Sequence, residues 1–253
     1  MPERARHLLI LGGTGEAAAI ARAAHAGFGA RLTLTTSFAG RTAAPVSPAG
    51  RVRIGGFGGV EGLVAYLERE RIDLLIDATH PFAATMSRHA RLAGDMTGVP
   101  RLVLARPPWT RLPDDRWHPV PDPVAAATLA ARLGRRVFLT VGAGDLRPFA
   151  AFPELRYLVR LVDRPATDLP LAAYDLVIGR GPFALADERR ILAEHGIEVL
   201  VCKASGGAAT AAKLVAAREA SVPVVMVERP PPEPGEAVST VHAALEWLAA
   251  RLG

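Results

Sequence analysis

The sequence predicts an α/β protein with two Rossmann-like open parallel-sheet domains in tandem and a cleft between them. Three observations predict this fold. Short apolar runs alternate with Ala-rich helical patterns, glycine-rich turns follow several of the apolar runs, and the second half of the chain repeats this order. Strands that alternate with helices favour parallel sheets, which bind ligands beyond the carboxyl ends of their strands.

Length and composition indicate a globular protein. The 253 residues are 50% hydrophobic and 22% charged, which is ordinary for a folded chain with one large or two small cores. Apolar runs fall well short of the ~20 residues needed to cross a membrane, and the amino-terminal residues lack the apolar segment of a signal peptide. The single Cys202 excludes an intrachain disulfide. We therefore expect a cytoplasmic protein without a membrane partner.

The formal net charge of +5 bears on the ligand. Neither a block of consecutive basic residues nor aromatic and basic residues in alternation is present, so nucleic acid is not expected. A multiply anionic small molecule would explain the charge, and so would a solvated Arg-rich surface. The sequence lacks zinc-ligand spacing, so we expect no metal. It also lacks a P-loop, the nucleophile elbow of hydrolases and the Tyr-x-x-x-Lys pair of short-chain dehydrogenases.

The first strand and its turn carry a nucleotide-binding signal. Leu8–Leu11 reads as a buried strand, Gly13-x-Gly15-x-x-Ala18 fits the dinucleotide fingerprint, and residues 17–26 read as a helix. Glycines allow a pyrophosphate to approach the backbone, and the amino end of a helix favours negative charge. A purely structural strand-turn-helix is the alternative. The cofactor-binding residues predicted here are Gly12, Gly13, Thr14, Gly15 and Glu16.

The end of the second strand, residues 31–36, favours NADP(H) over NAD(H). NAD-binding versions place an acidic residue about twenty positions after the glycines. No acidic residue occurs here between Glu16 and Glu61, and Ser37 and Arg41 stand in that region. A hydroxyl and a guanidinium suit a 2′-phosphate, although Arg41 could also be a solvated loop residue.

Two further loops of the first half are candidates. A predicted strand at 51–54 ends in a glycine loop at 55–59, and a predicted strand at 73–77 ends in a loop at 78–82. Helices are expected at 60–71 and 83–93, and another strand at 101–105. His80 can donate a proton near neutral pH, contact the cofactor or cap a helix. The predicted cofactor-binding residues of these loops are Gly55, Gly56, Thr79 and His80.

A proline-rich stretch divides the chain. It predicts a first domain at 1–108, a linker at 109–123 and a second domain at 124–253. In the second domain, strands are expected at 136–141, 157–162, 175–178, 198–202 and 222–227. Helices are expected at 124–133, 184–195, 208–220 and 238–252.

Cationic residues follow several of these strands. Lys203 ends a strand beside the Ser205–Gly207 turn, which resembles an anion-binding nest at the start of a helix. It can pair with a carboxylate, donate a proton or be an ordinary strand-end lysine. Guanidinium groups bind carboxylates in a bidentate way, so several of them suggest a polycarboxylate ligand. The arginines at strand ends and in the linker are Arg106, Arg160, Arg180 and Arg229.

Several motifs together resemble the precorrin-6A reductase family of the corrin pathway to cobalamin. They run from one end of the chain to the other, and the Asp-Ala-Thr-His-Pro-Phe and Lys-x-Ser-Gly-Gly pieces are the most specific. The chain has Ala at position 17 and at 208–209, where family members often have Gly. The matching segments are 11–16, 55–57, 77–82, 106–109, 181–183, 203–207 and 225–230.

The resemblance implies a reaction. NADPH would deliver hydride to one carbon of a ring C=C bond of precorrin-6A, and a proton would reach the neighbouring carbon to give precorrin-6B. The substrate is an anionic tetrapyrrole-derived macrocycle, and neighbouring enzymes of the corrin pathway are candidate partners. Lys203 and His80 are the catalytic candidates. The substrate-binding candidates are Arg106, Arg180, Lys203, Ser205, Gly206, Gly207 and Arg229.

Three other functions stay open at this point. A non-catalytic NADP(H)-sensing module would bind the cofactor without turnover. The substrate of a reductase could be the cobalt-bearing precorrin-6A, or another anionic molecule.

Overall fold

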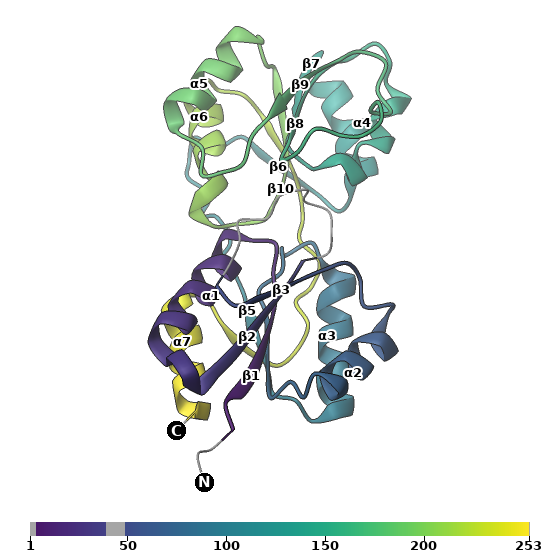
Figure 1. The fold of residues 1–253 in the computed structure, drawn as a ribbon. Helices are drawn as coiled ribbons and strands as arrows, with labels where there is room; N and C mark the ends of the chain where they lie inside the picture. Colours follow the sequence, from purple (N-terminus) through teal and green to yellow (C-terminus); the bar gives the residue numbers. More distant parts are fainter. Residues whose placement is uncertain (1–3, 39–48, 253) are drawn as a thin grey trace. The chain divides into compact units, whose positions relative to one another are not determined.

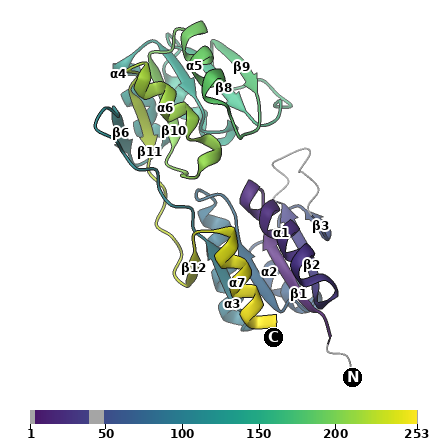
Figure 2. The same cartoon turned by 90° about the vertical axis from the view of Figure 1, so that its left-hand side faces the viewer.

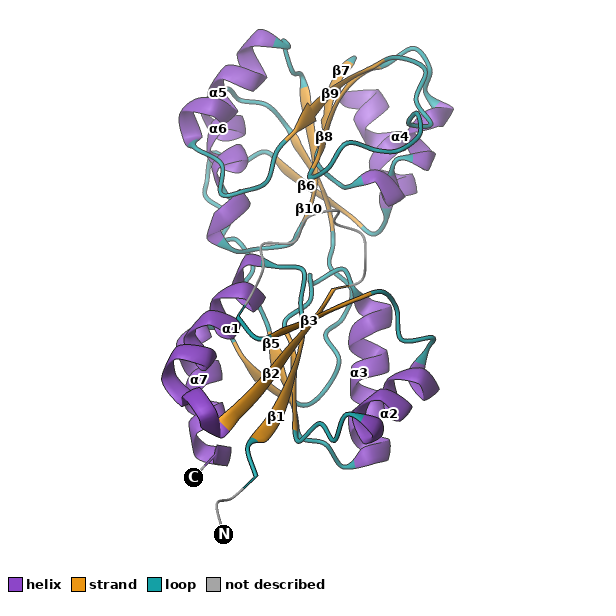
Figure 3. Ribbon diagram, viewed as in Figure 1, coloured by secondary structure: helices purple, strands orange, loops and turns teal. Residues whose placement is uncertain are grey.

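The computed structural model describes residues 4–38 and 49–252 and contains two compact units. The first unit comprises residues 1–106 and 230–253, and the second comprises residues 107–229. Each unit is built on one six-stranded parallel sheet with helices on its faces (Figure 1 and Figure 3). The predicted α/β class with two parallel sheets is confirmed.

The strands of the first sheet follow the order β12-β5-β4-β1-β2-β3. The strand order reverses between β1 and β4, and ligands of open α/β sheets bind at such a point. The strands are β1 (Arg6–Leu11), β2 (Leu32–Phe38), β3 (Arg51–Ile54), β4 (Leu74–Asp77), β5 (Arg101–Leu104) and β12 (Glu236–Val238).

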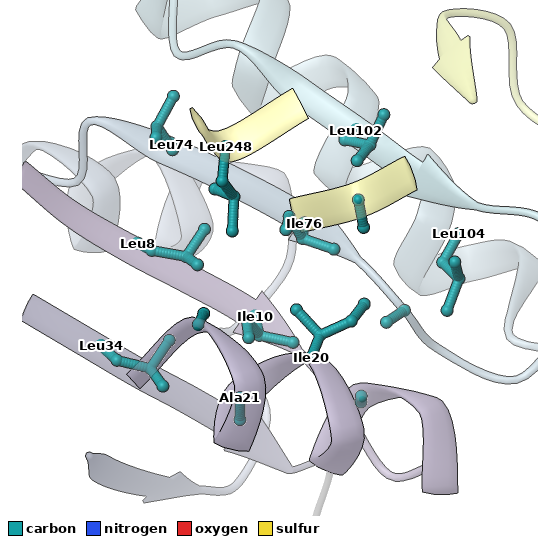
Figure 4. Packing of buried hydrophobic residues seen from close by; sticks show 14 of the residues in the cluster. Leu8, Ile10, Ile20, Ala21, Leu34, Leu74, Ile76, Leu102, Leu104 and Leu248 are labelled. Carbon is teal, nitrogen blue, oxygen red and sulfur yellow. The ribbon is translucent and has the colours of Figure 1, made fainter. Parts of the chain in front are cut away.

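Helices bury both faces of this sheet. On one face, α1 (Gly15–Phe28) and α7 (Val241–Leu252) pack side by side (Figure 2). Figure 4 shows the core between these helices and the sheet, where Ile20 and Leu248 share a cluster with the strand residues Leu8, Ile10 and Ile76. On the other face, α2 (Val60–Arg69) and α3 (Ala84–Thr97) cover a second cluster. Parallel sheets are normally covered on both faces, and this one is.

The carboxyl-terminal segment corrects the predicted domain division. The sequence placed residues 124–253 in the second domain, but β12 pairs with β5 at the edge of the first sheet. Trp247 and Leu248 of α7 are buried with Leu8 in the core of the first unit, and Trp247 Nε1 donates a 2.9 Å hydrogen bond to Glu236. The apolar stripe of α7 therefore covers a face of the first sheet.

The second sheet has the order β6-β11-β10-β7-β8-β9, so its strand order reverses between β7 and β10. All of its pairings are parallel. The strands are β6 (Trp117–Val120), β7 (Arg136–Leu139), β8 (Arg156–Leu161), β9 (Tyr174–Ile178), β10 (Val199–Lys203) and β11 (Val224–Val227).

The predicted linker at 109–123 is part of the second unit, because it contains β6. Strand β6 pairs with β11 and lies at the edge of the sheet, a place where Pro119 costs no interstrand hydrogen bond. The structure thus replaces the predicted boundaries with crossings after Arg106 and after Arg229.

Helices α4 (Pro123–Leu133), α5 (Leu185–Glu194) and α6 (Ala212–Glu219) complete the second unit. Helix α6 starts later than the predicted 208–220, because a short 3₁₀ segment, Ala208–Thr210, follows the glycines. Two more 3₁₀ segments, Ala143–Asp145 and Arg147–Ala151, follow β7. None of the described helices is long and apolar enough to cross a membrane.

Candidate active site

The glycine turn of the first unit is open to a ligand. Gly13 has a φ of +104°, and a Cβ on Gly13 or Gly15 would meet no described atom within 4 Å. Thr14 caps helix α1, since its Oγ1 accepts from the Ala17 N–H at 3.1 Å. The same hydroxyl donates to the Ala78 carbonyl at 2.8 Å, which joins the loops after β1 and β4. The turn therefore presents the amino end of a 14-residue helix at the reversal point of the sheet.

Glu16 and Arg106 form an ion pair of 2.8 Å. The sequence assigned them separately, to the cofactor and to the substrate. Because a carboxylate stands beside its guanidinium, Arg106 contributes less positive charge to an anionic ligand than its sequence position indicates.

A cation that the sequence analysis missed, Arg53, lies beside the end of β2. Arg53, on β3, places its Nη1 3.4 Å from the Ser37 hydroxyl and 2.5 Å from the Gly55 carbonyl, and its Nη2 2.8 Å from the Gly56 carbonyl. Its guanidinium lies 3.8 Å from the centre of the Phe57 ring. The predicted Arg41 lies outside the described residues. The position of Arg53 just before a glycine loop was the available signal, but parallel pairing with β2 is needed to place it beside Ser37.

The loop after β4 is ordered by a buried carboxylate. Asp77 Oδ1 accepts from the Thr79 N–H at 3.2 Å and from the Thr79 hydroxyl at 2.7 Å. His80 Nδ1 accepts from the Phe82 N–H at 3.2 Å, so a neutral His80 ring carries its proton on Nε2. The structure thus places Thr79 and His80 at the reversal point, next to the carbonyl that Thr14 binds.

In the second unit, Lys203 forms an ion pair with Asp145. Lys203 ends β10, and Asp145 lies in the 3₁₀ segment after β7, so the pair joins the two loops at the reversal point of this sheet. Both side chains are partly exposed, at 20% and 30%. Asp145 was not predicted, although it follows a Gly142–Gly144 turn that resembles the first glycine turn. An ammonium beside a carboxylate at a partly exposed place can deliver a proton.

The turn Ser205–Gly207 is held closely by its neighbours. Gly206 and Gly207 have φ of +66° and +79°, and a Cβ on Gly206 would lie 2.2 Å from the Pro107 carbonyl. Trp109 Nε1 donates to the Gly207 carbonyl at 2.7 Å. Arg229 Nε donates to the Ala204 carbonyl at 2.9 Å. The structure therefore brings Arg229 to this turn, which leads into a 3₁₀ segment rather than directly into the predicted α-helix.

The remaining arginines have different environments. Arg180 lies 3.9 Å from Asp163 in a half-exposed ion pair. Arg160 is buried, binds Glu188 through two hydrogen bonds of 2.7 and 2.9 Å, and lies 4.1 Å from the centre of the Phe183 ring. Arg160 thus makes buried contacts within the second unit and is not available to a ligand. The sequence had suggested a strand-end cation that could bind one.

Within the described residues, no cluster of three or more His, Cys, Asp or Glu side chains could hold a metal ion. The polar groups at the two reversal points are instead hydroxyls, backbone N–H groups, one imidazole and the Lys203–Asp145 pair. These groups suit an organic anion and proton transfer.

The family model, the similar sequences and a similar solved structure all point to the same family. The model of the family described as precorrin-6x reductase CbiJ/CobK matches residues 7–249. A precorrin-6A reductase of Rhodococcus erythropolis is 45% identical over 95% of this chain and 96% of its own, and one of Rhodobacter capsulatus is 46% identical over 96% and 95%. A solved structure described as CobK precorrin-6A reductase has a TM-score of 0.91 and 44% identity over 97% of this chain and 96% of that one.

Proposed function

Because the chain belongs to the precorrin-6x reductase family, we propose that it reduces a ring C=C bond of precorrin-6A to give precorrin-6B in cobalamin biosynthesis. Hydride passes from a nicotinamide cofactor to one carbon of the bond, and a proton passes to its neighbour. NADPH is oxidised to NADP⁺ as the macrocycle gains two hydrogen atoms.

The turns after β1 and β7 differ, and this difference supports binding of the cofactor pyrophosphate by the first unit. After β1 the chain enters α1 at once, and the capped amino end of this helix offers N–H groups and a positive dipole. After β7 the chain enters short 3₁₀ segments. The residues Gly12 to Glu16 are thus the proposed pyrophosphate site, with Gly55, Gly56, Thr79 and His80 toward the nicotinamide.

The choice of NADPH rests on the end of β2. Ser37 and Arg41 were predicted to hold the 2′-phosphate, and Arg53 adds a guanidinium 3.4 Å from the Ser37 hydroxyl. A cation and a hydroxyl at this place favour a phosphate over a free ribose hydroxyl.

The second unit supplies the groups that we assign to the substrate. Lys203 and Asp145 stand together at its reversal point. Lys203 donates the proton in this proposal, and His80 is the other candidate donor. In this proposal the acetate and propionate arms of the macrocycle bind Arg180, Ser205, Gly206, Gly207 and Arg229 of the second unit, and Arg106 of the first unit is a further candidate.

The test is NADPH consumption by the purified protein with precorrin-6A, with the product mass measured in parallel. Turnover with a gain of two hydrogen atoms supports the proposal. NADPH binding without turnover would point to the sensing module instead. A higher kcat/KM for cobalt-bearing precorrin-6A would move the substrate assignment to that form, and turnover of neither would overturn it.

A further inference from the structure

Lysine is rare in this chain, and both lysines lie in one region. Of the 30 Lys and Arg residues, 28 are arginines and only Lys203 and Lys213 are lysines. Lys203 ends β10, and Lys213 lies in the first turn of α6, the helix that follows β10. An amine differs from a guanidinium because it is compact and can lose its proton in a buried place.

The amine of Lys213 is buried and contacts two separate segments. The residue is 6% exposed, and its Nζ donates to the Thr140 hydroxyl at 3.0 Å. That hydroxyl donates in turn to the Val201 carbonyl of β10 at 3.0 Å. Nζ also lies 5.8 Å from the centre of the Trp109 ring, whose Nε1 binds the Gly207 carbonyl. One amine therefore contacts the start of the segment that leads to Asp145 and the indole that holds the Ser205–Gly207 turn.

This arrangement costs stability. Among the described residues, Lys213 has no ion pair, and burial lowers the pKa of its ammonium. Arg160 lowers this pKa further, while Cys202 and Glu188 raise it. A methionine has a similar length and would not lose hydration on burial. Costly buried polar groups are typical of functional sites, where they hold a geometry that an apolar core would leave loose.

We propose that Lys213 is a positioning residue for the substrate site of the second unit. It holds the Thr140–Asp145 segment and the Trp109-bound glycine turn in one arrangement, so that Lys203, Asp145 and the turn present fixed groups to the substrate. This inference rests on the proposed function for its kinetic consequence. Its structural consequence is independent of that function, since it concerns only the order of the two segments.

The experiment compares Lys213→Met with Arg218→Met, a control on the same helix. Arg218 is partly buried and pairs with Asp115 at 2.8 Å through its Nε. Lys213→Met should speed amide hydrogen exchange about tenfold in the peptides that contain residues 140–146 and 203–211. It should also lower kcat/KM for precorrin-6A about 10- to 100-fold at an unchanged KM for NADPH. Its Tm should stay equal or rise, whereas Arg218→Met should lower the Tm and leave both exchange and kcat/KM unchanged.

Unchanged exchange in both peptides would overturn the positioning role, and so would equal effects of the two variants on kcat/KM. If Lys213→Met does not fold, Thr140→Val decides, because it preserves volume and removes the hydroxyl that Lys213 binds. Faster exchange in the same peptides then supports the role, and unchanged exchange rejects it. If the wild-type protein turns over no precorrin-6A, the proposed function fails, while the exchange data still decide the role of Lys213.

Discussion

The two units share the order of five strands, β5-β4-β1-β2-β3 and β11-β10-β7-β8-β9, but the turns after β1 and β7 form different structures. In each sheet the strand order reverses beside a central strand, β1 in the first and β7 in the second. A glycine with positive φ follows each of these strands, Gly13 at +104° and Gly142 at +93°. After Gly13 the chain forms a long α-helix, and after Gly142 it forms a 3₁₀ turn. The first arrangement suits a phosphate, and the second places the Asp145 side chain beside β10.

The contacts that join the loops at the two reversal points also differ in charge. In the first unit, the neutral Thr14 hydroxyl binds the Ala78 carbonyl. In the second unit, the Lys203–Asp145 ion pair occupies the corresponding place. The same fold therefore places a hydroxyl–carbonyl contact at one reversal point and an ion pair at the other, so the loops rather than the sheet set the groups that each point offers.

The largest expected effect tests the acid–base side of this comparison. Lys203→Met removes the proposed proton donor and should lower kcat about 100-fold or more with little change in the KM for NADPH. Steady-state kinetics with precorrin-6A measure this. Arg189→Met, which removes an exposed cation of α5, is the control and should keep wild-type kcat.

His80→Gln is the complementary variant. A fall in kcat for His80→Gln, with Lys203→Met near wild type, would move the proton donor to the first unit and break the comparison.

A pair of glycine variants tests the phosphate side. Gly13→Ala and Gly142→Ala strain the backbone alike, since both positions have positive φ. Gly13→Ala should raise the KM for NADPH about 30-fold, because its methyl group would enter the space that we propose for the pyrophosphate. Gly142→Ala should leave that KM unchanged. A similar rise for both variants would show that strain, rather than position, causes the effect.

The cofactor preference gives a smaller effect. Arg53→Met should raise the KM for NADPH about tenfold more than the KM for NADH, because the guanidinium near Ser37 favours the 2′-phosphate. Arg41→Ala should likewise raise the KM for NADPH much more than the KM for NADH. Arg51→Met, at an exposed position on the same strand, is the control. Equal changes for both cofactors would remove the arginine concerned from the phosphate site.

The smallest effect concerns the opposite ends of the strands. Glu198 Oε2 accepts from the Arg135 and Arg136 N–H groups at 2.5 and 3.3 Å, as Asp73 accepts from the His7 N–H in the first unit. The Arg135 hydrogen bond is the main reason why the pKa of Glu198 is lowered. Its stabilisation is therefore present above the pKa of an unfolded glutamate and is lost as the pH falls through the lower folded value.

Glu198→Gln should accordingly lower the Tm by about 1–2 °C at neutral pH, because the side chain is exposed and water screens its charge. The difference from wild type should vanish in acid, below the folded pKa. Thermal unfolding at several pH values measures this, and a difference that persists in acid would assign the effect to shape rather than charge.

Local patterns predicted much of the fold. The apolar run at Leu8–Leu11 and the glycines after it specify a strand and a turn without reference to other parts of the chain, and the structure has both. The fold class and the family could therefore be predicted. The boundary at Pro230 could not, because β12 has three residues and its pairing with β5 is a long-range contact.

The same reason limited the prediction of the site. Lys203 was predicted as a site residue because it ends an apolar strand. Its partner Asp145 lies in the turn after another strand, and only the sheet order brings the two together. Arg53 and Ser37 meet through the register of β2 and β3. Proline made residues 117–120 look unlike a strand, although an edge position tolerates Pro119.

The return of β12 and α7 to the first unit sets an order of events during synthesis. The second unit is one continuous segment, residues 107–229, and can fold as soon as it leaves the ribosome. The first unit begins earlier in the sequence, but its core around Leu8 is complete only when Trp247 and Leu248 have been synthesised. The first unit is thus completed after the second, and a chain that stops before Pro230 leaves exposed the part of the sheet face that α7 covers.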